Sequence, residues 1–532
     1  MKKIISVLLA AALIFSLCGC TVYSRRADLT VGVLDEIKSF SPGKAAGDAE
    51  IITAVNCFEG LMRTDENGSV SPAGATACSV SADGLVYTFK LNPKAKWHLT
   101  DAAGAVLEAS GIKPSKFNDS VTASDYKESF IRAIGEKSPG YENLLCIKGA
   151  RAFAETGKSP EKIGIAAQDD HTLIITLEKP CIDFTDALAL PVALPESALF
   201  RKAAGSIYGT TVSTVICNGT YYPREYSETG TLILEENPDY KGIADTLNST
   251  VTLYLTGKKD SLRSRFDDGT YDVFLSRGAD TGIKTKPDCS RCGEVWGLMF
   301  NCASEAASDK NLRLALACAT DFDSVKLPEF AHAYAEEIIP MSYTLNTCPY
   351  SETADGIKQN FDPLLTDIYF NSVNDLPVKL KIRVPAELEN TFKKICSLWE
   401  SEFPGKIETT VSVFDRSEAD KIAAEADFDI AVLPVKTDFT TACAALESLT
   451  KAPCNCSDPE IAAAISSARS ADPRTVNEEI IKAQNAIIGT AAFIPIFDVE
   501  CSVYSADGIS GIYTAPNEKI IYFNAAVKKD SK

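Results

Sequence analysis

Hydrophobic and polar positions in the later half of the chain predict strands separated by helices. Residues 378–384 alternate apolar and polar side chains, as a strand with one buried face does. Residues 388–399 then repeat apolar side chains at helical spacing, and further strands are predicted at 407–413 and 428–433, with a short helix at 418–426 between them. Strands that alternate with helices indicate a parallel sheet covered by helices.

The earlier half of the chain has a different pattern, which is typical of an α+β unit. Strands are predicted at 29–33, 86–91 and 173–178, with turns and irregular segments between them. A helix is predicted over 124–134, where Ser124 stands as a capping residue and apolar side chains recur on one face.

The N-terminal segment has the layout of a bacterial lipoprotein signal peptide. Two lysines precede an apolar run of 14 residues, 4–17, which is shorter than the roughly 18 residues of a membrane span. The run ends at Leu-Cys-Gly-Cys, residues 17–20. We expect residues 1–19 to be removed, Cys20 to carry two acyl chains, and residues 20–27 to serve as lipid anchor and tether on the extracytoplasmic face of the cell membrane.

The length of the chain indicates how many lobes it forms, and its net charge indicates which classes of partner are disfavoured. A chain of 532 residues is too long for one apolar core and predicts two or three lobes. The formal net charge is −19, and loss of Lys2 and Lys3 with the signal would take it to −21. Such a charge disfavours nucleic acid and anionic lipid headgroups as partners.

The cysteines do not predict a metal site. Seventeen of them are scattered along the chain, and the only tight pairs are Cys289 with Cys292 and Cys454 with Cys456. Neither pair has a neighbouring histidine to complete a tetrahedral zinc site, so a disulfide within or between these loops is favoured over a metal ion.

Catalytic motifs are also missing from the sequence. There is no H-E-x-x-H, G-x-S-x-G, Walker or G-x-G-x-x-G motif, and the three histidines, His98, His171 and His332, are far apart. These observations predict a protein that is not an enzyme and uses no cofactor.

A series of short motifs then runs along nearly the whole mature chain. They are Phe58-Glu59-Gly60-Leu61-Met62-Arg63, Asp65-x-Asn67-Gly68, Pro72-x-x-Ala75, Asp83-Gly84-x-x-Tyr87-x-Phe89-x-Leu91, Ala95-Lys96-Trp97, Val121-Thr122-Ala123-Ser124-Asp125-Tyr126, Asn218-Gly219-Thr220-Tyr221-Tyr222, Leu234-x-x-Asn237-x-x-Tyr240, Asn311-x-Arg313-x-Ala315-Leu316 and residues 483–495. In order and spacing they resemble the oligopeptide-binding (family 5) solute receptors of ABC transporters. Relative to that family, about two dozen residues are inserted between Trp97 and Val121, and we expect them to form a surface loop.

That resemblance implies an α/β fold of two lobes, with an additional α+β domain inserted in the first lobe and the ligand between the lobes. The implied division is 28–48, 180–258 and 492–532 for lobe one, 49–179 for the accessory domain, and 259–491 for lobe two. The chain crossings near residues 258 and 492 would then act as hinges for closure.

The candidate ligand-binding residues are Val435, Lys436, Asp438 and Phe439. On topology alone, the loop after residue 433 lies beyond the carboxyl end of a strand, where ligands bind in such sheets. Peptide receptors of the family commonly carry Trp-x-x-Asp-Tyr-x-x-Pro here, and this chain keeps the aspartate and an aromatic residue but not the tryptophan or the proline. The resemblance implies that Asp438 receives a peptide's terminal ammonium.

The resemblance further implies a monomeric, lipid-anchored receptor that captures short peptides and delivers them to an ABC permease. Two alternatives stay open. The same fold could bind a sugar, a metal chelate or another amine, or the chain could be a surface enzyme, redox protein or signalling protein, because a fold does not fix a function.

Overall fold

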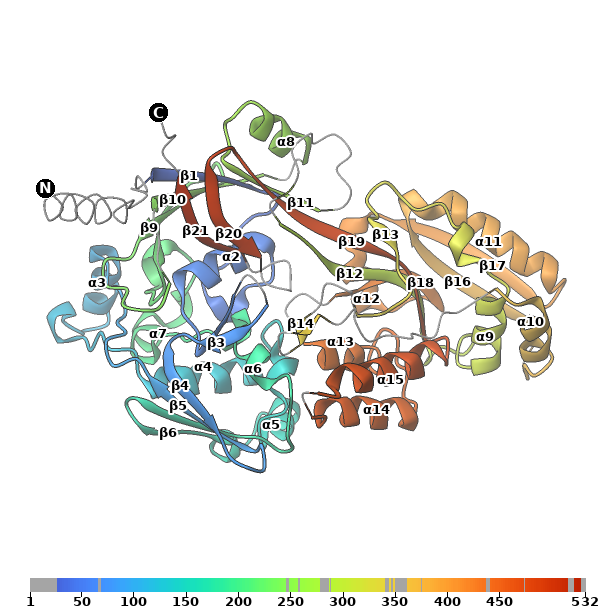
Figure 1. Ribbon diagram of the computed structural model, residues 1–532, viewed down its shortest axis with the longest axis horizontal. Helices are drawn as coiled ribbons and strands as arrows, with labels where there is room; N and C mark the ends of the chain where they lie inside the picture. Colours follow the sequence, from blue (N-terminus) through green and yellow to red (C-terminus); the bar gives the residue numbers. More distant parts are fainter. Residues whose placement is uncertain are drawn as a thin grey trace, which may run out of the picture.

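The computed structural model describes most of the chain from residue 26 to residue 527 (Figure 1). The described residues are 26–65, 68–244, 248–256, 259–277, 287, 289–339, 344–345, 348–349, 361–374, 376–436, 441–472, 474–514 and 521–527. The predicted signal peptide, Cys20, Asp438 and Phe439 lie outside them. Among the helices so described, none is long and apolar enough to cross a membrane.

One eleven-stranded sheet runs through both halves of the molecule (Figure 1). Its order is β17 (Ile407–Phe414), β16 (Val378–Pro385), β18 (Ile430–Lys436), β12 (Cys289–Phe300), β19 (Phe493–Ser505), β11 (Val273–Arg277), β1 (Arg26–Val33), β10 (Asn248–Leu255), β9 (Thr231–Glu236) and β8 (Tyr221–Tyr226), while β13 (Ala333–Tyr334) pairs with β19. The long antiparallel pair β12 and β19 carries the sheet from one half to the other. The α/β, two-lobed fold class predicted from the sequence is confirmed.

The three strands predicted in the later half are present, but the sheet around them is mixed. Strands β16, β17 and β18 are parallel, as expected, whereas β12 runs antiparallel to β18. The expectation of a parallel sheet is therefore wrong at this pairing, because β12 enters from the other half of the molecule. The prediction of a loop after residue 433 is also wrong, because β18 continues to Lys436, which pairs in register with Glu294.

Two large apolar clusters form the interior of the two halves. The first gathers residues from 29 to 273 and several from the C-terminal strands, and it includes Trp97. The second spans residues 295 to 499 and includes Trp296 and Trp399. Trp399 is fully buried and donates a hydrogen bond through Nε1 to Thr320 Oγ1 at 2.9 Å. The bounds predicted for lobe one, the accessory domain and lobe two stay a prediction.

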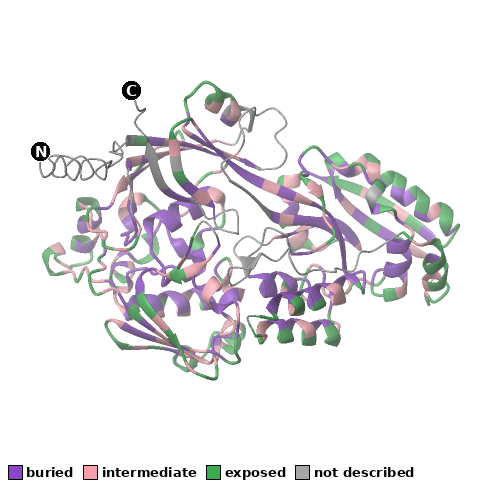
Figure 2. Cartoon of the chain, in the orientation of Figure 1, coloured by how far each residue is buried: buried purple, intermediate pink, exposed green. Residues whose placement is uncertain are grey.

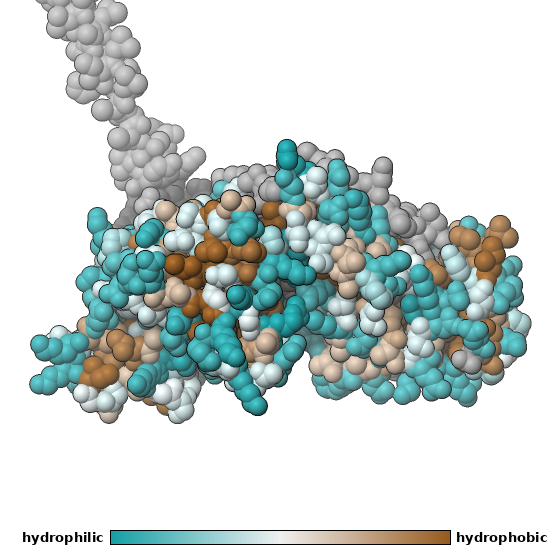
Figure 3. Space-filling model, turned by 90° about the horizontal axis from the view of Figure 1, so that it is seen from below, coloured by the Kyte–Doolittle hydropathy of each residue, from teal (hydrophilic) through white to brown (hydrophobic). Residues whose placement is uncertain are grey.

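Helices cover the sheet in the second half. Three of them, α13 (Ala442–Ser448), α14 (Pro459–Arg469) and α15 (Val476–Ile488), form a layer below the sheet in Figure 1, and Figure 2 shows buried residues along α13, α15 and β19. The others are α9 (Lys310–Cys318), α10 (Pro363–Phe370), α11 (Glu389–Glu402) and α12 (Ala419–Glu425). Helix α10 carries the exposed apolar side chains Leu364, Leu365 and Ile368. A brown area lies at the right end of Figure 3, the end at which Figure 1 places α10.

The first half adds a four-stranded antiparallel sheet and a group of shorter helices. The sheet order is β4 (Ala75–Val80), β5 (Val86–Leu91), β7 (Thr172–Thr176) and β6 (Ile165–Asp169). The remaining elements used below are α2 (Asp48–Cys57), α3 (Asp101–Ala109), α4 (Ala123–Glu136), α5 (Ala150–Thr156), α6 (Phe184–Ala187) and the short 3-10 helix η3 (Tyr141–Leu144).

Two local predictions in this half need correction. Helix α4 is capped by Thr122 rather than Ser124, because the Thr122 N–H donates to Asp125 Oδ2 at 2.8 Å. The inserted segment after Trp97 is not a simple surface loop. It contains α3, whose N-terminus is capped by Thr100 and whose Leu107 is fully buried, so apolar packing stabilises the insertion.

Gly219 shows why the Asn-Gly motif matters for this fold. Its N–H donates to the Cys57 carbonyl oxygen at 2.8 Å. A Cβ atom at this position would lie 2.5 Å from the Cys57 carbonyl carbon and 2.6 Å from the Phe58 nitrogen. Because these are backbone atoms that cannot move aside, only glycine allows the turn to pack against the end of α2.

Candidate ligand site

Two of the four predicted ligand residues lie at the described end of β18. Val435 is 3% exposed and belongs to the second apolar cluster. Lys436 Nζ lies 2.6 Å and 2.8 Å from the two carboxylate oxygens of Asp420. Both residues line a small cavity of about 110 Å³. Asp438 and Phe439 fall outside the described residues, and the ligand roles of all four stay predictions.

Thr441, the first described residue after Lys436, lies at a contact between the two halves. Thr441 caps α13 by accepting a hydrogen bond from the Ala444 N–H. The Thr441 N–H itself donates to Asn143 Oδ1 of η3 at 3.1 Å, and this bond is buried. Since η3 belongs to the first half and α13 to the second, this hydrogen bond crosses the junction of the halves.

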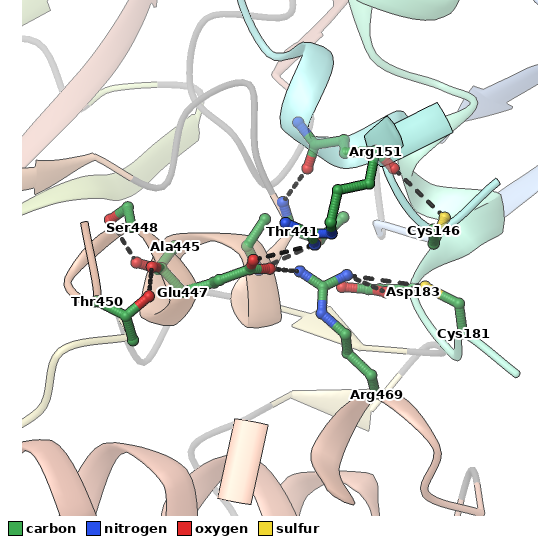
Figure 4. Close-up of polar contacts among 12 residues, drawn as sticks. Cys146, Arg151, Cys181, Asp183, Thr441, Ala445, Glu447, Ser448, Thr450 and Arg469 are labelled. Atoms are coloured by element: carbon green, nitrogen blue, oxygen red, sulfur yellow. Dashed lines mark hydrogen bonds and ion pairs between the residues drawn. The ribbon is translucent and has the colours of Figure 1, made fainter. Parts of the chain in front are cut away.

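A partly buried group of charged residues joins the two halves at the same junction. We call Arg151, Asp183, Glu447 and Arg469 the seam network (Figure 4). Arg469, the last residue of α14, lies 2.8 Å from Glu447 Oε2 and 4.0 Å from Asp183 Oδ1. Arg151 of α5 lies 3.3 Å from Glu447 Oε1, and the Ile182 N–H donates to the Arg469 carbonyl at 2.9 Å.

Burial and neighbouring charges act in opposite directions on Arg469 and Glu447 of the seam network. Burial opposes the charge of Arg469, but Asp183 and the neighbouring acidic groups raise the pKa of its guanidinium. Burial alone would raise the pKa of Glu447, but Arg469, Lys451 and Arg151 together lower it. Arg469 and Glu447 therefore depend on ion-pair partners from both halves, as expected for partly buried ion pairs.

A cavity of about 620 Å³ lies beside the seam network, and we call it the seam pocket. Its size falls within the range of small-molecule sites. It is lined from both halves by carboxylates, cations and a few apolar or sulfur-bearing side chains: Glu142, Leu145, Cys146, Ile147, Gly149, Arg151, Ala152, Glu155, Glu178, Lys179, Pro180, Cys181, Glu447, Thr450, Ala462, Ile465, Ser466, Arg469 and Ser470. A ligand with both positive and negative groups could find partners on these walls.

The described part of the chain shows no arrangement for metal chemistry. Within it, no three histidine, cysteine or acidic side chains are placed to hold a metal ion. Cys454 and Cys456 are free, buried thiols, so neither forms the disulfide expected within or between these loops. The side chains of Cys289 and Cys292 lie outside the described residues. The polar groups at the seam are hydrogen-bonding and charged side chains.

Asp186 of α6, close to the seam network, is expected to make stability fall as the pH rises. Burial, and then the charge of Asp183, raises the pKa of Asp186 to about 7. The residue as a whole is partly exposed, but its Oδ2 is buried and lacks a hydrogen-bond partner among the described residues. The folded chain thus keeps a proton that the unfolded chain releases near pH 4, and stability should fall by up to about 4 kcal/mol between about pH 4 and 7.

Asp186→Asn should flatten this part of the stability profile, as measured by urea unfolding across the pH range. Asp367→Asn, at an exposed position of α10, is the control and should keep the wild-type profile. Identical slopes for wild type and Asp186→Asn would show that Asp186 does not carry a shifted proton.

Comparison with known proteins decides the family. The family described as bacterial extracellular solute-binding proteins, family 5 (middle), matches residues 69–327. The chain belongs to the family 5 solute-binding proteins. The resemblance stated from the sequence motifs is thereby confirmed.

Family 5 relatives among characterised proteins are peptide-binding proteins by name. The periplasmic murein peptide-binding protein MppA of Escherichia coli is 27% identical over 341 residues, which are 60% of this chain and 59% of that protein. The periplasmic oligopeptide-binding protein OppA of E. coli is 28% identical over 245 residues, 45% of this chain and 41% of that protein. The matches thus span less than two thirds of these relatives.

Solved structures confirm the fold over almost the whole chain. Listeria monocytogenes OppA bound to peptide has a TM-score of 0.71 at 20% identity, covering 95% of this chain and 100% of that one. The murein tripeptide-binding protein MppA of E. coli has a TM-score of 0.69 at 20% identity, covering 96% and 100%. At this identity the likeness establishes the two-lobed architecture.

Proposed function

We propose that this protein is the lipid-anchored, extracytoplasmic binding component of an ABC importer and that it captures short peptides between its two lobes. The observation that carries the proposal is its membership of family 5, whose matched relatives are named for binding murein peptides, oligopeptides and dipeptides. Delivery to a permease and attachment through Cys20 are parts of the same proposal.

The described contacts support a mechanism of capture by closure. The two apolar clusters are connected by β12 and β19, and their facing surfaces meet at the seam network. Hydrophilic side chains gather between the two halves on the face shown in Figure 3. A ligand that contacts both halves favours the closed arrangement through its higher affinity for that state, and no covalent step is required.

In this proposal the ligand's terminal ammonium binds at Asp438, and Val435, Lys436 and Phe439 form the adjoining wall. Lys436 would contribute through its aliphatic stem, since its ammonium group is already paired with Asp420. The protein acts as a monomer and without a cofactor, and the division into lobe one, accessory domain and lobe two gives the hinges for closure.

Equilibrium dialysis of residues 21–532 against a mixture of di- to pentapeptides, beside a turnover assay on the same mixture, tests the function. We expect peptides to be retained at one site per chain and recovered unchanged. Retention of a sugar, amine or metal chelate in place of peptides would favour another cargo on the same fold, and chemical conversion of the mixture would identify an enzyme.

Replacement of Cys20 by alanine is expected to release the protein from the membrane. The two acyl chains attached to this residue would supply about 0.8 kcal/mol for each buried CH₂ group. The measurement is fractionation after labelling with a radioactive or clickable fatty acid. Cys18→Ala is the matched control and should keep both label and membrane attachment. Membrane retention of unlabelled Cys20→Ala would refute the anchor.

A further inference from the structure

Cys146 and Cys181 lie side by side on the wall of the seam pocket. Their backbones are held together because the Glu178 N–H donates to the Cys146 carbonyl at 2.9 Å, and Ile147 pairs with Leu177 in an antiparallel bridge. The two thiols are close enough to interact electrostatically. A disulfide requires neighbouring backbones and facing Cβ atoms, and this pairing supplies the neighbourhood.

The pair is accessible from the pocket, which distinguishes it from a second thiol pair in the first half. Cys146 is partly exposed, and Cys181 is 5% exposed but lines the same cavity. Cys57 and Cys217 also interact with each other, yet they are 0% and 1% exposed. A small oxidant in the seam pocket can therefore reach Cys146, whereas Cys57 and Cys217 are shielded by the core.

Each sulfur also touches residues that join the halves. Cys181 Sγ donates to Asp183 Oδ1 at 2.9 Å and lies 3.9 Å from Arg469 Nη1. Cys146 Sγ donates to the Asn143 carbonyl at 3.6 Å, and Asn143 holds the Thr441 N–H. The Cys181 sulfur thus touches the seam network directly, and the Cys146 sulfur touches the neighbouring contact between η3 and α13.

We propose that Cys146 and Cys181 form a reversible disulfide site, oxidised by small-molecule disulfides that enter the seam pocket. In the first step the Cys146 sulfur, after losing its proton to solvent, attacks one sulfur of the small disulfide and releases one thiolate. In the second step the Cys181 sulfur attacks Cys146 and displaces the second thiolate, while its own proton leaves along the hydrogen bond to Asp183. Two protein thiols are oxidised, and one small disulfide is reduced to two thiols.

The order of these steps follows from the surroundings of the two sulfurs. The neighbouring Cys146 sulfur, then burial and the charge of Asp183, raise the pKa of the Cys181 thiol. Cys146 is also the more exposed of the two sulfurs, so Cys146 reacts first and Cys181 resolves the mixed disulfide. Once the disulfide forms, Cys181 no longer donates to Asp183, so oxidation removes one hydrogen bond from the seam.

The test uses fully reduced residues 21–532, incubated with glutathione disulfide under native conditions, quenched with N-ethylmaleimide and mapped by peptide mass spectrometry. We expect Cys146 and Cys181 to be linked at least about tenfold faster than Cys57 and Cys217, since reactivity follows thiolate character and exposure. Cys57 and Cys217 should react only after denaturant is added. Dithiothreitol should restore both Cys146 and Cys181 to free thiols.

Two serine variants test the roles of the individual cysteines. Cys181→Ser should trap glutathione on Cys146, because the resolving thiol is missing, whereas Cys78→Ser, at a half-exposed cysteine of β4, should leave the oxidation of the pair unchanged. The proposal is overturned if wild-type protein keeps glutathione on Cys146 without forming the linkage, if neither cysteine reacts, or if the two pairs are oxidised at the same rate.

Discussion

Replacement of Arg469 by methionine is expected to lower the stability of the protein by about 3 kcal/mol, because two acidic side chains would lose their shared cation inside the junction. The Arg469 side chain is 18% exposed, and the side chains of Asp183 and Glu447 are 2% and 21% exposed. Methionine keeps much of the length and apolar stem of arginine, so the loss would come mainly from the charge and its hydrogen bonds.

Urea unfolding followed by tryptophan fluorescence measures this effect in both halves. Trp97 reports on the first apolar cluster, and Trp296 and Trp399 report on the second. Arg474→Met is the matched control, because Arg474 forms an exposed ion pair with Asp472, and it should leave the midpoint unchanged. An unchanged midpoint for Arg469→Met would show that the seam network does not stabilise the junction.

Replacement of Asp438 by asparagine is expected to weaken peptide binding by roughly two to three orders of magnitude. This prediction rests on the proposed function, in which Asp438 receives the terminal ammonium of the peptide. Removing one partner from an enclosed charge pair commonly costs about 3 to 5 kcal/mol, and each 1.4 kcal/mol or so is a factor of ten in affinity.

Calorimetry with a retained peptide and its N-acetylated form measures the effect. Acetylation and the substitution should each weaken binding, and their effects should not add, because both remove the same pair. Asp427→Asn is the control, since Asp427 is exposed and pairs with Lys381. Equal affinity for the free and acetylated peptides would refute the role of Asp438 while leaving the receptor fold intact.

Local periodicity was sufficient to predict several elements of the fold. The apolar stripe over residues 388–399 corresponds to α11, and the alternating pattern over 378–384 corresponds to β16. In these segments the pattern reflects a face that packs on the core, which sequence spacing records directly. The mixed pairing of β12 with β18 could not be predicted, because it depends on where a distant strand returns to the sheet.

The seam network gave no signal in the sequence. Arg151 and Glu447 are 296 residues apart, and neither belongs to a recurrent motif, so only the folded chain brings them together. The cysteine that meets another cysteine is likewise decided by the fold and not by the spacing in the sequence. Sequence spacing drew attention to Cys454 with Cys456, whereas the thiol pair that borders the pocket, Cys146 and Cys181, is separated by a helix and two strands. Spacing identifies local pairs, and tertiary contacts decide which groups meet.

Native mass spectrometry of residues 21–532, purified without added ligand and then denatured to release any bound molecule, tests the proposed function most directly. We expect one bound species per chain, lost on denaturation and fragmenting as a short peptide with a free amino terminus. A released sugar, amine or metal chelate, or a chain that binds none of the peptides offered after its cargo is removed, would contradict peptide capture between the lobes.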